Sequence, residues 1–439
     1  MSQRQLQVQI NGQLVGSLFD QNNVWGFQYA ESWLQQPRPF ALSPALPLGP
    51  ELLLDGATLR PVQWFFDNLL PEERLREVIV KEEGVEAADA FGLLARLGSE
   101  SAGALVLQPP GAPDAPQGAM ELTREALSAR IRNLPRASLT HQAPKRMSLA
   151  GAQHKMVVSF DPATGRLMEP LKGSPSTHIL KPNSTADGFP HSVVNELFTM
   201  RLAGALGLKV PKVWRLYVPE PVYIIERFDR KTTAPGGDVQ RIHALDGCQS
   251  LNEMAYAKYR SATFEKLLQL IELCRNRAAA RLDVFRWILF NTLVGNSDCH
   301  LKNISFLIDD EGTRVAPFYD LLCTAVYHTK SMANEQAVWP DEKLAMPIVG
   351  AHFFSGVTRP RLIATAVALK LGKKTAEREV DAMVNKLPQA ADSVIQAMEA
   401  EHGTSPQMGQ ASGATRGAEA HLLRAIRHVV IKDMLDLVR

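Results

Sequence analysis

The sequence has little cysteine, no marked excess of either charge and no long apolar run, and each absence excludes a class of protein. Only 4 of its 439 residues are cysteines, and no two of them form a C-x-x-C pair. That spacing argues against a zinc site and a disulfide framework, and it favours a reducing cytosol. Lysine and arginine number 48 against 46 acidic residues, so the net charge of +2 indicates no particular partner.

Other absences narrow the choice further. No uninterrupted apolar run reaches the roughly 18 residues of a membrane span, so we expect no contact with a membrane. After Met1 the chain enters alternating, strand-like sequence, and no signal peptide is apparent. The sequence contains no H-E-x-x-H, no G-x-S-x-G and no Walker loop, so the enzyme classes marked by those motifs have little support.

The composition is that of a globular protein, with 45% hydrophobic and 21% charged residues. A chain of this length exceeds one compact core, so we expect two or three packed units. The first should be a small α/β unit over residues 1–108. It begins with a β-hairpin, because residues 6–10 and 13–18 alternate on either side of Asn11-Gly12. Further elements are expected as a strand at 25–29, helices at 63–70, 72–81 and 88–96, and a strand at 104–107.

A proline-rich linker follows the first unit, and strands then give way to helices. Residues 109–139 are expected to hold this linker and a helix at 121–134. Residues 140–246 should be rich in strands, and residues 247–401 mostly helical. The expected helices of this second half cover 191–206, 264–277, 282–294, 361–371, 376–387 and 390–401. Residues 402–417 are rich in glycine and serine and predict a flexible linker before a last amphipathic helix at 418–439.

The stretch Asn296-Ser-Asp-Cys-His-Leu-Lys-Asn303 carries the main chemical signal. It follows a buried-type helix and a single glycine, and it precedes a predicted strand, a turn and a second strand over 315–320 that ends at Asp320. Protein kinases place a base aspartate and a metal-binding asparagine five residues apart, with a second metal-binding aspartate further on. Taken singly, Asp298, Asn303 and Asp320 are better explained as turn formers.

Two further segments are consistent with a kinase, but each also has a simpler structural explanation. The small-residue loop at 147–155 precedes a predicted strand and could lie over phosphates, although a plain hairpin turn explains it more simply. Lys181 ends a short strand, where a kinase keeps its phosphate-pairing lysine, or it is a solvated strand end. Glu196 could pair with that lysine, but we expect it to be a surface residue.

Taken together and in this order, these motifs resemble the HipA family of serine/threonine kinase toxins from type II toxin–antitoxin modules. The likeness covers nearly the whole chain, including the segments 66–72 and 97–104. It implies an α+β, two-lobed, protein-kinase-like fold that binds ATP and Mg²⁺. The motifs that carry it are Ser148-Leu-Ala-Gly-Ala-Gln153 with Lys155, Thr177-His-Ile-Leu-Lys181, Glu226-Arg-Phe-Asp-Arg230, Asp298-Cys-His-Leu-Lys-Asn303 and Pro317-Phe-Tyr-Asp320.

The resemblance also implies roles for individual residues. Asp298 would be the catalytic base, Asn303 and Asp320 would hold magnesium, and Ser148 would be the site of autophosphorylation. A phosphate on Ser148 would add negative charge beside the ATP loop and switch the kinase off. The implied ATP-binding residues are Ala150, Gly151, Ala152, Gln153, His154, Lys155, Lys181, Glu226, Arg227, Phe228, His300, Leu301, Lys302, Asn303, Tyr319 and Asp320.

The family further implies a cytoplasmic toxin that is neutralised by a HipB-like helix-turn-helix antitoxin, the two together repressing transcription at operator DNA. Its protein substrate would be a translation factor such as glutamyl-tRNA synthetase, the aminoacyl-tRNA synthetase that charges glutamate. Phosphorylation of that substrate would cause growth arrest and persistence. Two alternatives stay open. One is a small-molecule or lipid kinase of related fold, and the other is a catalytically silent corepressor that binds an antitoxin.

Overall fold

The computed structural model describes residues 3–113, 115–232, 238–402 and 405–439, and it divides the chain into two compact units. Unit 1 comprises Met1–Lys181, Glu226–Ala257 and Ser305–Ala316, and unit 2 comprises Pro182–Ile225, Lys258–Ile304 and Pro317–Arg439. The segments alternate along the chain, so this division differs from the contiguous boundaries expected at 246 and 401.

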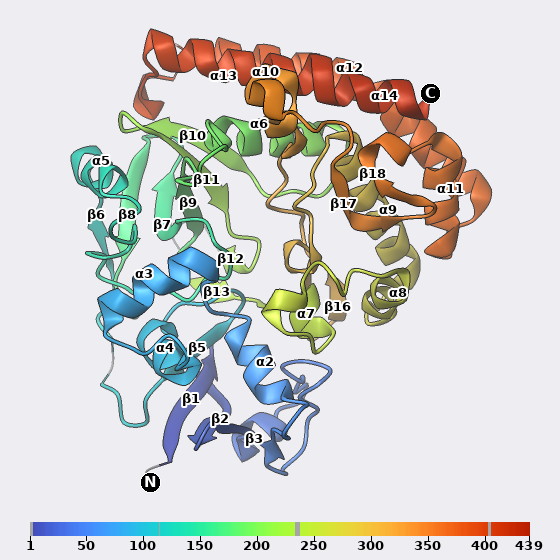
Figure 1. Cartoon of the computed structure of the whole chain (residues 1–439). Helices are drawn as coiled ribbons and strands as arrows, with labels where there is room; N and C mark the ends of the chain where they lie inside the picture. Colours follow the sequence, from blue (N-terminus) through green and yellow to red (C-terminus); the bar gives the residue numbers. More distant parts are fainter. Residues whose placement is uncertain (1–2, 114, 233–237, 403–404) are drawn as a thin grey trace. The chain divides into compact units, whose positions relative to one another are not determined.

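Unit 1 begins with a five-stranded antiparallel sheet in the order β4-β3-β2-β1-β5 (Figure 1). Asn11 and Gly12 take φ angles of 48° and 80°, so the predicted tight hairpin turn is confirmed. Helix α2 packs against β3 and helix α4 against β5, and the rings of Trp25 and Phe91 meet edge to face in the core between. The bounds are β1 Arg4–Ile10, β2 Gln13–Gln21, β3 Val24–Tyr29, β4 Leu53–Leu54, β5 Leu105–Gln108, α1 Glu31–Leu34, α2 Pro61–Asp67, α3 Glu73–Glu83 and α4 Ala90–Leu97.

The rest of unit 1 is also built from short strands. Strands β9, β7, β8 and β6 lie side by side in that order, and β14, β15 and β16 form a separate antiparallel sheet. Strands β6 and β8 were not predicted, and helix α5 is shorter than the expected 121–134. The bounds are β6 Ala119–Glu121, α5 Arg124–Arg132, β7 Met156–Asp161, β8 Arg166–Pro170, β9 His178–Pro182, β12 Arg230–Thr232, β13 Val239–Arg241, β14 His243–Asp246, α7 Gly247–Ser250, β15 Ser305–Asp309 and β16 Gly312–Val315.

Unit 2 is mostly helical. Its central helix α9 is buried over most of its second half, and the long helix α12 lies beside α6 and α11 (Figure 1). The strands β10 and β11 form an antiparallel hairpin, of which β10 was not predicted. The bounds are α6 Ser192–Ala205, β10 Val213–Tyr217, β11 Pro221–Glu226, α8 Phe264–Glu272, α9 Arg277–Leu293, α10 Lys330–Ala333, β17 Lys343–Ile348, β18 Ala351–Phe353, α11 Arg359–Ala368, α12 Lys373–Ala400, α13 Gly413–Ala425 and α14 Lys432–Val438.

Three expectations about unit 2 were wrong. Helix α12 runs as one helix through Pro388, where we expected two, because the packed apolar face on both sides of the proline outweighs one lost backbone hydrogen bond. The last helix begins at Gly413, and a π-helical turn, Ile426–Ile431, joins α13 to α14. Part of the expected linker is packed, since a Cβ on Gly409 would lie 2.3 Å from the carbonyl oxygen of Tyr217. Residues 403–404 of that linker lie outside the described residues.

Within the described residues, none of the helices combines the length and the apolar character needed to cross a bilayer.

Gly295 lies just after α9, where the backbone turns and packs closely against neighbouring side chains. Its φ is +68°, and a Cβ there would lie 2.6 Å from Val430 Cγ1 and 2.8 Å from Ala325 Cβ. Gly207, also in unit 2, has a φ of +85°, but a Cβ on this residue would meet no other side chain or backbone atom within 4 Å. The two glycines share the left-handed backbone and differ in the space around them.

We therefore expect Gly295→Ala to destabilise the protein more than Gly207→Ala. The left-handed backbone costs an alanine about 1–2 kcal/mol at either position, and the clash at Gly295 adds about 1–3 kcal/mol. Thermal unfolding of the two variants beside the unaltered protein measures the difference. Equal melting temperatures for the two variants would contradict this account of Gly295.

Candidate active site

Unit 2 holds the segment Asn296–Asn303 in a fixed loop directly after α9. The backbone N–H of Asn296 donates to the carbonyl of Asn291 at 2.8 Å, and the Asn296 side chain accepts from the Asp298 N–H at 3.0 Å. The Ser297 N–H donates to Thr324 Oγ1 at 2.7 Å. A short 3₁₀ turn, Leu301–Asn303, closes the loop, so both ends are anchored by hydrogen bonds.

The loop separates an exposed aspartate from a buried asparagine. The Asp298 side chain is exposed, whereas Asn303 is buried with 5% exposure. The Asn303 Nδ2 donates to the Asp298 carbonyl oxygen at 3.0 Å, which fixes the amide and directs its oxygen to the opposite side. The spacing of five residues therefore brings both predicted functional groups into one hydrogen-bonded loop.

Asp320 belongs to a neighbouring segment of the same unit. The Tyr319 hydroxyl donates to the Lys302 carbonyl at 2.7 Å, which ties this segment to the loop of Asp298 and Asn303. Asp320 has a φ of +58°, a left-handed conformation that aspartate tolerates better than most residues. The predicted second strand over 315–320 was wrong, because β16 ends at Val315 and residues 316–320 are irregular.

Buried polar groups surround Asp320. Burial, followed by the negative charges of Glu196 and Asp320, raises the pKa of Tyr223 well above its ordinary value. Glu196 is only 2% exposed, so the expectation of a surface glutamate was wrong. Its helix α6 is buried on nearly every side, and a charge with no outward face cannot be solvated.

The oxygen donors of Asn303 and Asp320 suit magnesium chemically. Magnesium prefers oxygen ligands and is usually held by one or two carboxylates together with substrate phosphates. Among the residues that the structure describes, no group of three or more His, Cys, Asp or Glu could hold a metal on its own. The pair offers two oxygen-bearing side chains of the kind that binds magnesium together with phosphates.

In unit 1 the predicted ATP loop is folded against the N-terminal part of the chain. The Ser148 side chain has no exposed surface, and its Oγ donates to the Leu69 carbonyl at 2.9 Å. The carbonyl of Gly151 accepts from the Glu72 N–H at 3.2 Å. The Lys155 ammonium donates to the Ala150 carbonyl at 2.6 Å. A Cβ on Gly151 would lie 2.7 Å from the Lys155 Nζ. This is a compact loop and not a simple hairpin turn.

The remaining predicted ligands of unit 1 differ in exposure. Lys181 is 8% exposed at the end of β9, so it is not a solvated strand end. Glu226 is exposed and Phe228 half-buried. Burial lowers the pKa of His154 and so favours its neutral form. The Arg227 guanidinium is buried and pairs with Glu100 at 2.9 Å and with Asp229 at 2.7 Å. The side chain is therefore engaged in these ion pairs, and the backbone is the part of Arg227 left for a ligand.

Glu100 was not among the predicted site residues, although it lies in the family-like segment 97–104. Its carboxylate has no exposed surface and accepts hydrogen bonds from four cations and from Ser176 Oγ. Its backbone carbonyl accepts from the Ser148 N–H at 2.6 Å. The four cations are Lys145 at 2.6 Å, Arg230 at 2.7 Å, Arg241 at 2.8 Å and Arg227 at 2.9 Å. In the sequence Glu100 stands out only as a charge among small residues between a helix and a strand, which does not identify its partners.

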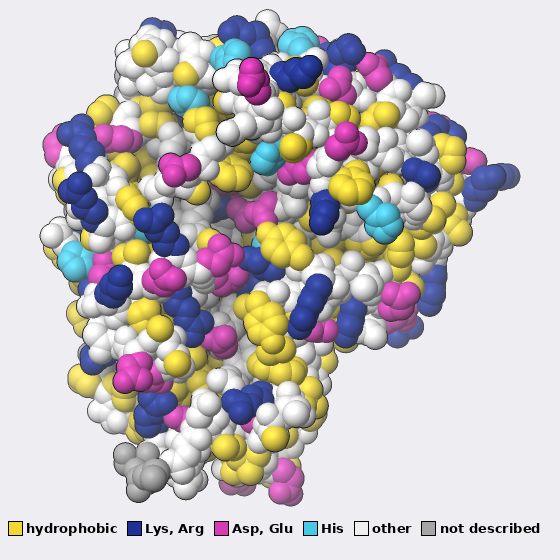
Figure 2. Space-filling view, in the orientation of Figure 1, with side chains coloured by type: hydrophobic (Ala, Val, Ile, Leu, Met, Phe, Trp, Pro, Cys, Tyr) yellow, Lys and Arg dark blue, Asp and Glu magenta, His cyan; other side chains and the backbone are white. Residues whose placement is uncertain are grey.

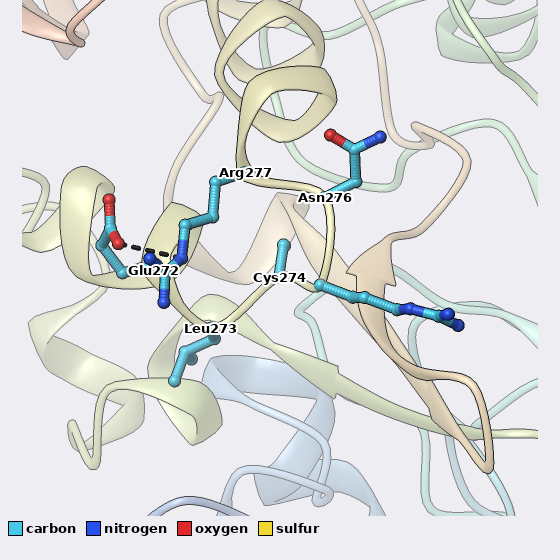
Figure 3. Close-up of a pocket in the computed structure, with 6 residues that line it drawn as sticks. Glu272, Leu273, Cys274, Asn276 and Arg277 are labelled. Atoms are coloured by element: carbon cyan, nitrogen blue, oxygen red, sulfur yellow. Dashed lines mark ion pairs between the residues drawn. The ribbon is translucent and has the colours of Figure 1, made fainter.

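A surface pocket of about 690 Å³ lies elsewhere in unit 2, at the turn between α8 and α9. Figure 3 shows its lining residues, Glu272 to Arg277, and the ion pair of 3.0 Å between Glu272 and Arg277. None of the predicted site residues lines this pocket. On the face shown in Figure 2, acidic and basic side chains are interspersed, in keeping with the small net charge.

The loop of unit 2 defines the class of protein. An exposed aspartate, an asparagine five residues later and an aspartate tied to the same loop match, in residue type and spacing, the pattern found in protein-kinase-like phosphotransferases.

Comparison with known proteins identifies the family. Residues 147–391, more than half of the chain, match the HipA-like C-terminal domain, and residues 6–108 match the HipA N-terminal domain. The chain is 39% identical over 343 residues to the "Putative kinase Y4mE" of Sinorhizobium fredii, covering 74% of this chain and 79% of that protein. It is 29% identical over 410 residues to the serine/threonine-protein kinase toxin HipA of Shewanella oneidensis, covering 89% of each.

A solved structure agrees with these matches. The Shewanella oneidensis HipA, solved in complex with HipB and operator DNA, has a TM-score of 0.76 and 26% sequence identity over 98% of this chain and 99% of that one. The expected α+β, HipA-like kinase fold is therefore confirmed. The chain belongs to the HipA family and is a serine/threonine-protein kinase of that family, which binds ATP.

The Glu100 cluster generates a stability prediction. Burial alone would raise the pKa of Glu100, but Arg241, Arg230, Arg227 and Lys145 hold it well below its ordinary value. Replacing Glu100 by glutamine leaves Lys145 and Arg241 without this carboxylate and leaves Arg227 and Arg230 to Asp229 alone, which should cost about 3–5 kcal/mol of stability at neutral pH. Glu121→Gln, which alters an exposed pair with Arg166, is the control and should change stability little.

The pH dependence has a definite sign. Because the pKa of Glu100 in the folded protein lies below the ordinary value of 4.5, its contribution is present above pH 4.5. The contribution is lost as pH falls through the folded pKa. The difference in melting temperature between the unaltered protein and Glu100→Gln should therefore be at its full value near pH 5 and shrink as the pH falls below 4.5. A difference that grows on acidification contradicts the assignment.

Proposed function

We propose that Asp298 is the catalytic base of this kinase and that Asn303 and Asp320 hold Mg²⁺ against the phosphates of ATP. The observation that supports this best is the loop itself. It presents the Asp298 carboxylate at the surface while a hydrogen bond from Asn303 fixes the backbone beneath it. Phosphoryl transfer depends on positioning and charge neutralisation more than on covalent chemistry, so a rigid loop with these groups suffices.

Each group has a distinct task in this proposal. The Asp298 carboxylate orients the acceptor hydroxyl and accepts its proton as the oxygen attacks the γ-phosphorus and the bond from that phosphorus to the bridging oxygen breaks, which releases ADP. Asn303 and Asp320 would hold Mg²⁺, which would supply positive charge to the phosphates of ATP. Lys181, His300 and Lys302 contribute positive or hydrogen-bonding groups to the triphosphate. Residues 150–155 cover the phosphates, Leu301 and Tyr319 shape the site, and Glu226, Arg227 and Phe228 contact the adenine through backbone groups and packing.

Ser148 is the proposed site of autophosphorylation. In this structure its Oγ is buried and donates to Leu69, so the loop must leave its position before the hydroxyl can react. A phosphate carries about −1.5 to −2 charges and cannot return to the space beside the Leu69 and Glu100 carbonyls. Phosphorylation would thus keep the loop away from its closed position and switch the kinase off.

The cellular role is proposed by analogy with the similar HipA. That protein is called a toxin and was solved with HipB and operator DNA. We infer that this chain is likewise the toxin of a two-component module in the cytoplasm, neutralised by a HipB-like helix-turn-helix antitoxin with which it represses transcription at operator DNA. Its substrate is proposed to be a translation factor, such as glutamyl-tRNA synthetase, whose phosphorylation arrests growth.

The proposed base is tested by substitution. Asp298→Asn keeps the size of the side chain and removes the proton acceptor, so transfer from Mg·ATP should fall by about 10²–10⁴-fold. Intact-mass and peptide mass spectrometry after incubation with Mg·ATP measures transfer to Ser148. Asp309→Asn is the matched control, since Asp309 ends β15 and pairs with Arg314 outside the proposed site. Full activity of Asp298→Asn would rule out its role as base.

The proposed switch has a separate test. Ser148→Ala should preserve the initial rate of ATP turnover and abolish the gradual loss of activity during preincubation with Mg·ATP. Ser159→Ala, on strand β7 of the same unit, is the control and should lose activity at the rate of the unaltered protein. If Ser148→Ala were inactivated at the same rate, autoinhibition through this serine would be excluded.

A further inference from the structure

Tyr259 occupies the reactive face of the proposed base. Its hydroxyl donates a hydrogen bond to Asp298 Oδ1. Both side chains are exposed, and Tyr259 retains 46% of its surface accessibility. An exposed aromatic side chain thus lies on the carboxylate that the kinase mechanism requires to meet an acceptor hydroxyl.

The backbone at Tyr259 is held against the same loop. The carbonyl of Lys258 accepts from the Leu301 N–H at 3.1 Å, so the residue preceding Tyr259 is tied to the catalytic loop. Lys258 is 8% exposed, in contrast to Tyr259. The anchor is therefore buried while the tyrosine ring lies at the surface, where rotation about its side-chain bonds can move it without unfolding the segment.

Two neighbours position the ring. The Tyr259 and His300 rings meet edge to face with centroids 5.0 Å apart and an interplanar angle of 82°. The Lys258 ammonium lies 5.5 Å from the centroid of the Tyr259 ring. Edge-to-face and cation–π contacts of this kind are individually weak, so they favour one position of the ring without locking it.

The hydrogen bond to Asp298 has the chemistry of substrate binding. A general base must accept a hydrogen bond from the hydroxyl that it will deprotonate. The Tyr259 hydroxyl makes that bond in this structure, and a serine or threonine hydroxyl can make it equally well. Water can make it too, but water must compete with a hydroxyl that is already attached to the protein.

We propose that Tyr259 is a specificity-determining residue whose hydroxyl fills the acceptor position at Asp298 and is displaced by the hydroxyl of a protein substrate. The inference rests on the proposed function of Asp298 as base. Tyr259 thereby limits wasteful transfer of phosphate to water, because a protein substrate brings enough additional contacts to displace the ring and a water molecule does not.

The test uses the full-length protein and water as the acceptor. The initial rate of phosphate release from Mg·ATP is measured without any added protein substrate, and the affinity for Mg·ATP is measured by calorimetry. Tyr259→Phe keeps the ring and removes only the competing hydroxyl. Loss of one hydrogen bond to a charged group should raise ATP hydrolysis about tenfold while leaving the affinity for Mg·ATP unchanged.

Controls separate this inference from the function on which it rests. Tyr256→Phe removes another exposed tyrosine hydroxyl from the same stretch of chain and should leave hydrolysis unchanged. Asp298→Asn should lower hydrolysis, and adding Tyr259→Phe to it should restore nothing. A gain of rate in Tyr259→Phe alone is also a result that partial misfolding does not produce.

Different outcomes overturn different claims. Unchanged or reduced hydrolysis in Tyr259→Phe, with normal binding of Mg·ATP, overturns the role of Tyr259 and leaves the proposed base intact. A gain that persists in the double variant with Asp298→Asn also overturns it, because Tyr259 would then act elsewhere. Phosphate found on Tyr259 by peptide mass spectrometry would make it a substrate and not a competitor. Undiminished hydrolysis in Asp298→Asn alone contradicts the proposed function instead.

Discussion

A charge buried away from water must be neutralised where it lies, and Glu100 imposes this constraint on much of unit 1. Its carboxylate meets cations from three separate stretches of chain, at Lys145, at Arg227 and Arg230, and at Arg241. An unpaired buried charge costs several kcal/mol, so these stretches can fold only by converging on one point. Because the Glu100 backbone also bonds to Ser148, the same convergence fixes the loop that is proposed to cover ATP.

In unit 2 the important contacts are hydrogen bonds and not ion pairs. Hydrogen bonds to the backbone hold a polar loop in place at the end of a buried helix. Gly295 allows the turn, and Asn303 holds the backbone of Asp298. These contacts leave the Asp298 carboxylate exposed, where neighbouring side chains can bind it. Tyr259 does so through a hydrogen bond from its hydroxyl. If this loop is the catalytic centre, as proposed, its rate depends on position, and small side-chain movements at its surface would select between acceptors.

Local patterns in the sequence predicted local structure well. The Asn11-Gly12 hairpin and the helix-to-loop transition before Asp298 depend on residues close together in the chain, and both were confirmed. The continuity of α12 through Pro388 and the burial of Glu196 were not predictable, since tertiary packing decides them. The Glu100 cluster was also beyond reach, because its ion pairs join residues up to 141 positions apart. The roles of the site residues remain predictions from family resemblance.

The central claim is that the catalytic loop and Asp320 together hold the metal that accompanies ATP. A crystal structure of the protein with Mg²⁺ and a non-hydrolysable ATP analogue tests it most directly. The account predicts a metal about 2.0–2.1 Å from an oxygen of Asp320 and from the amide oxygen of Asn303, with phosphate oxygens completing its shell. A nucleotide bound with its metal on other residues, and with Asn303 and Asp320 distant from it, would contradict the account.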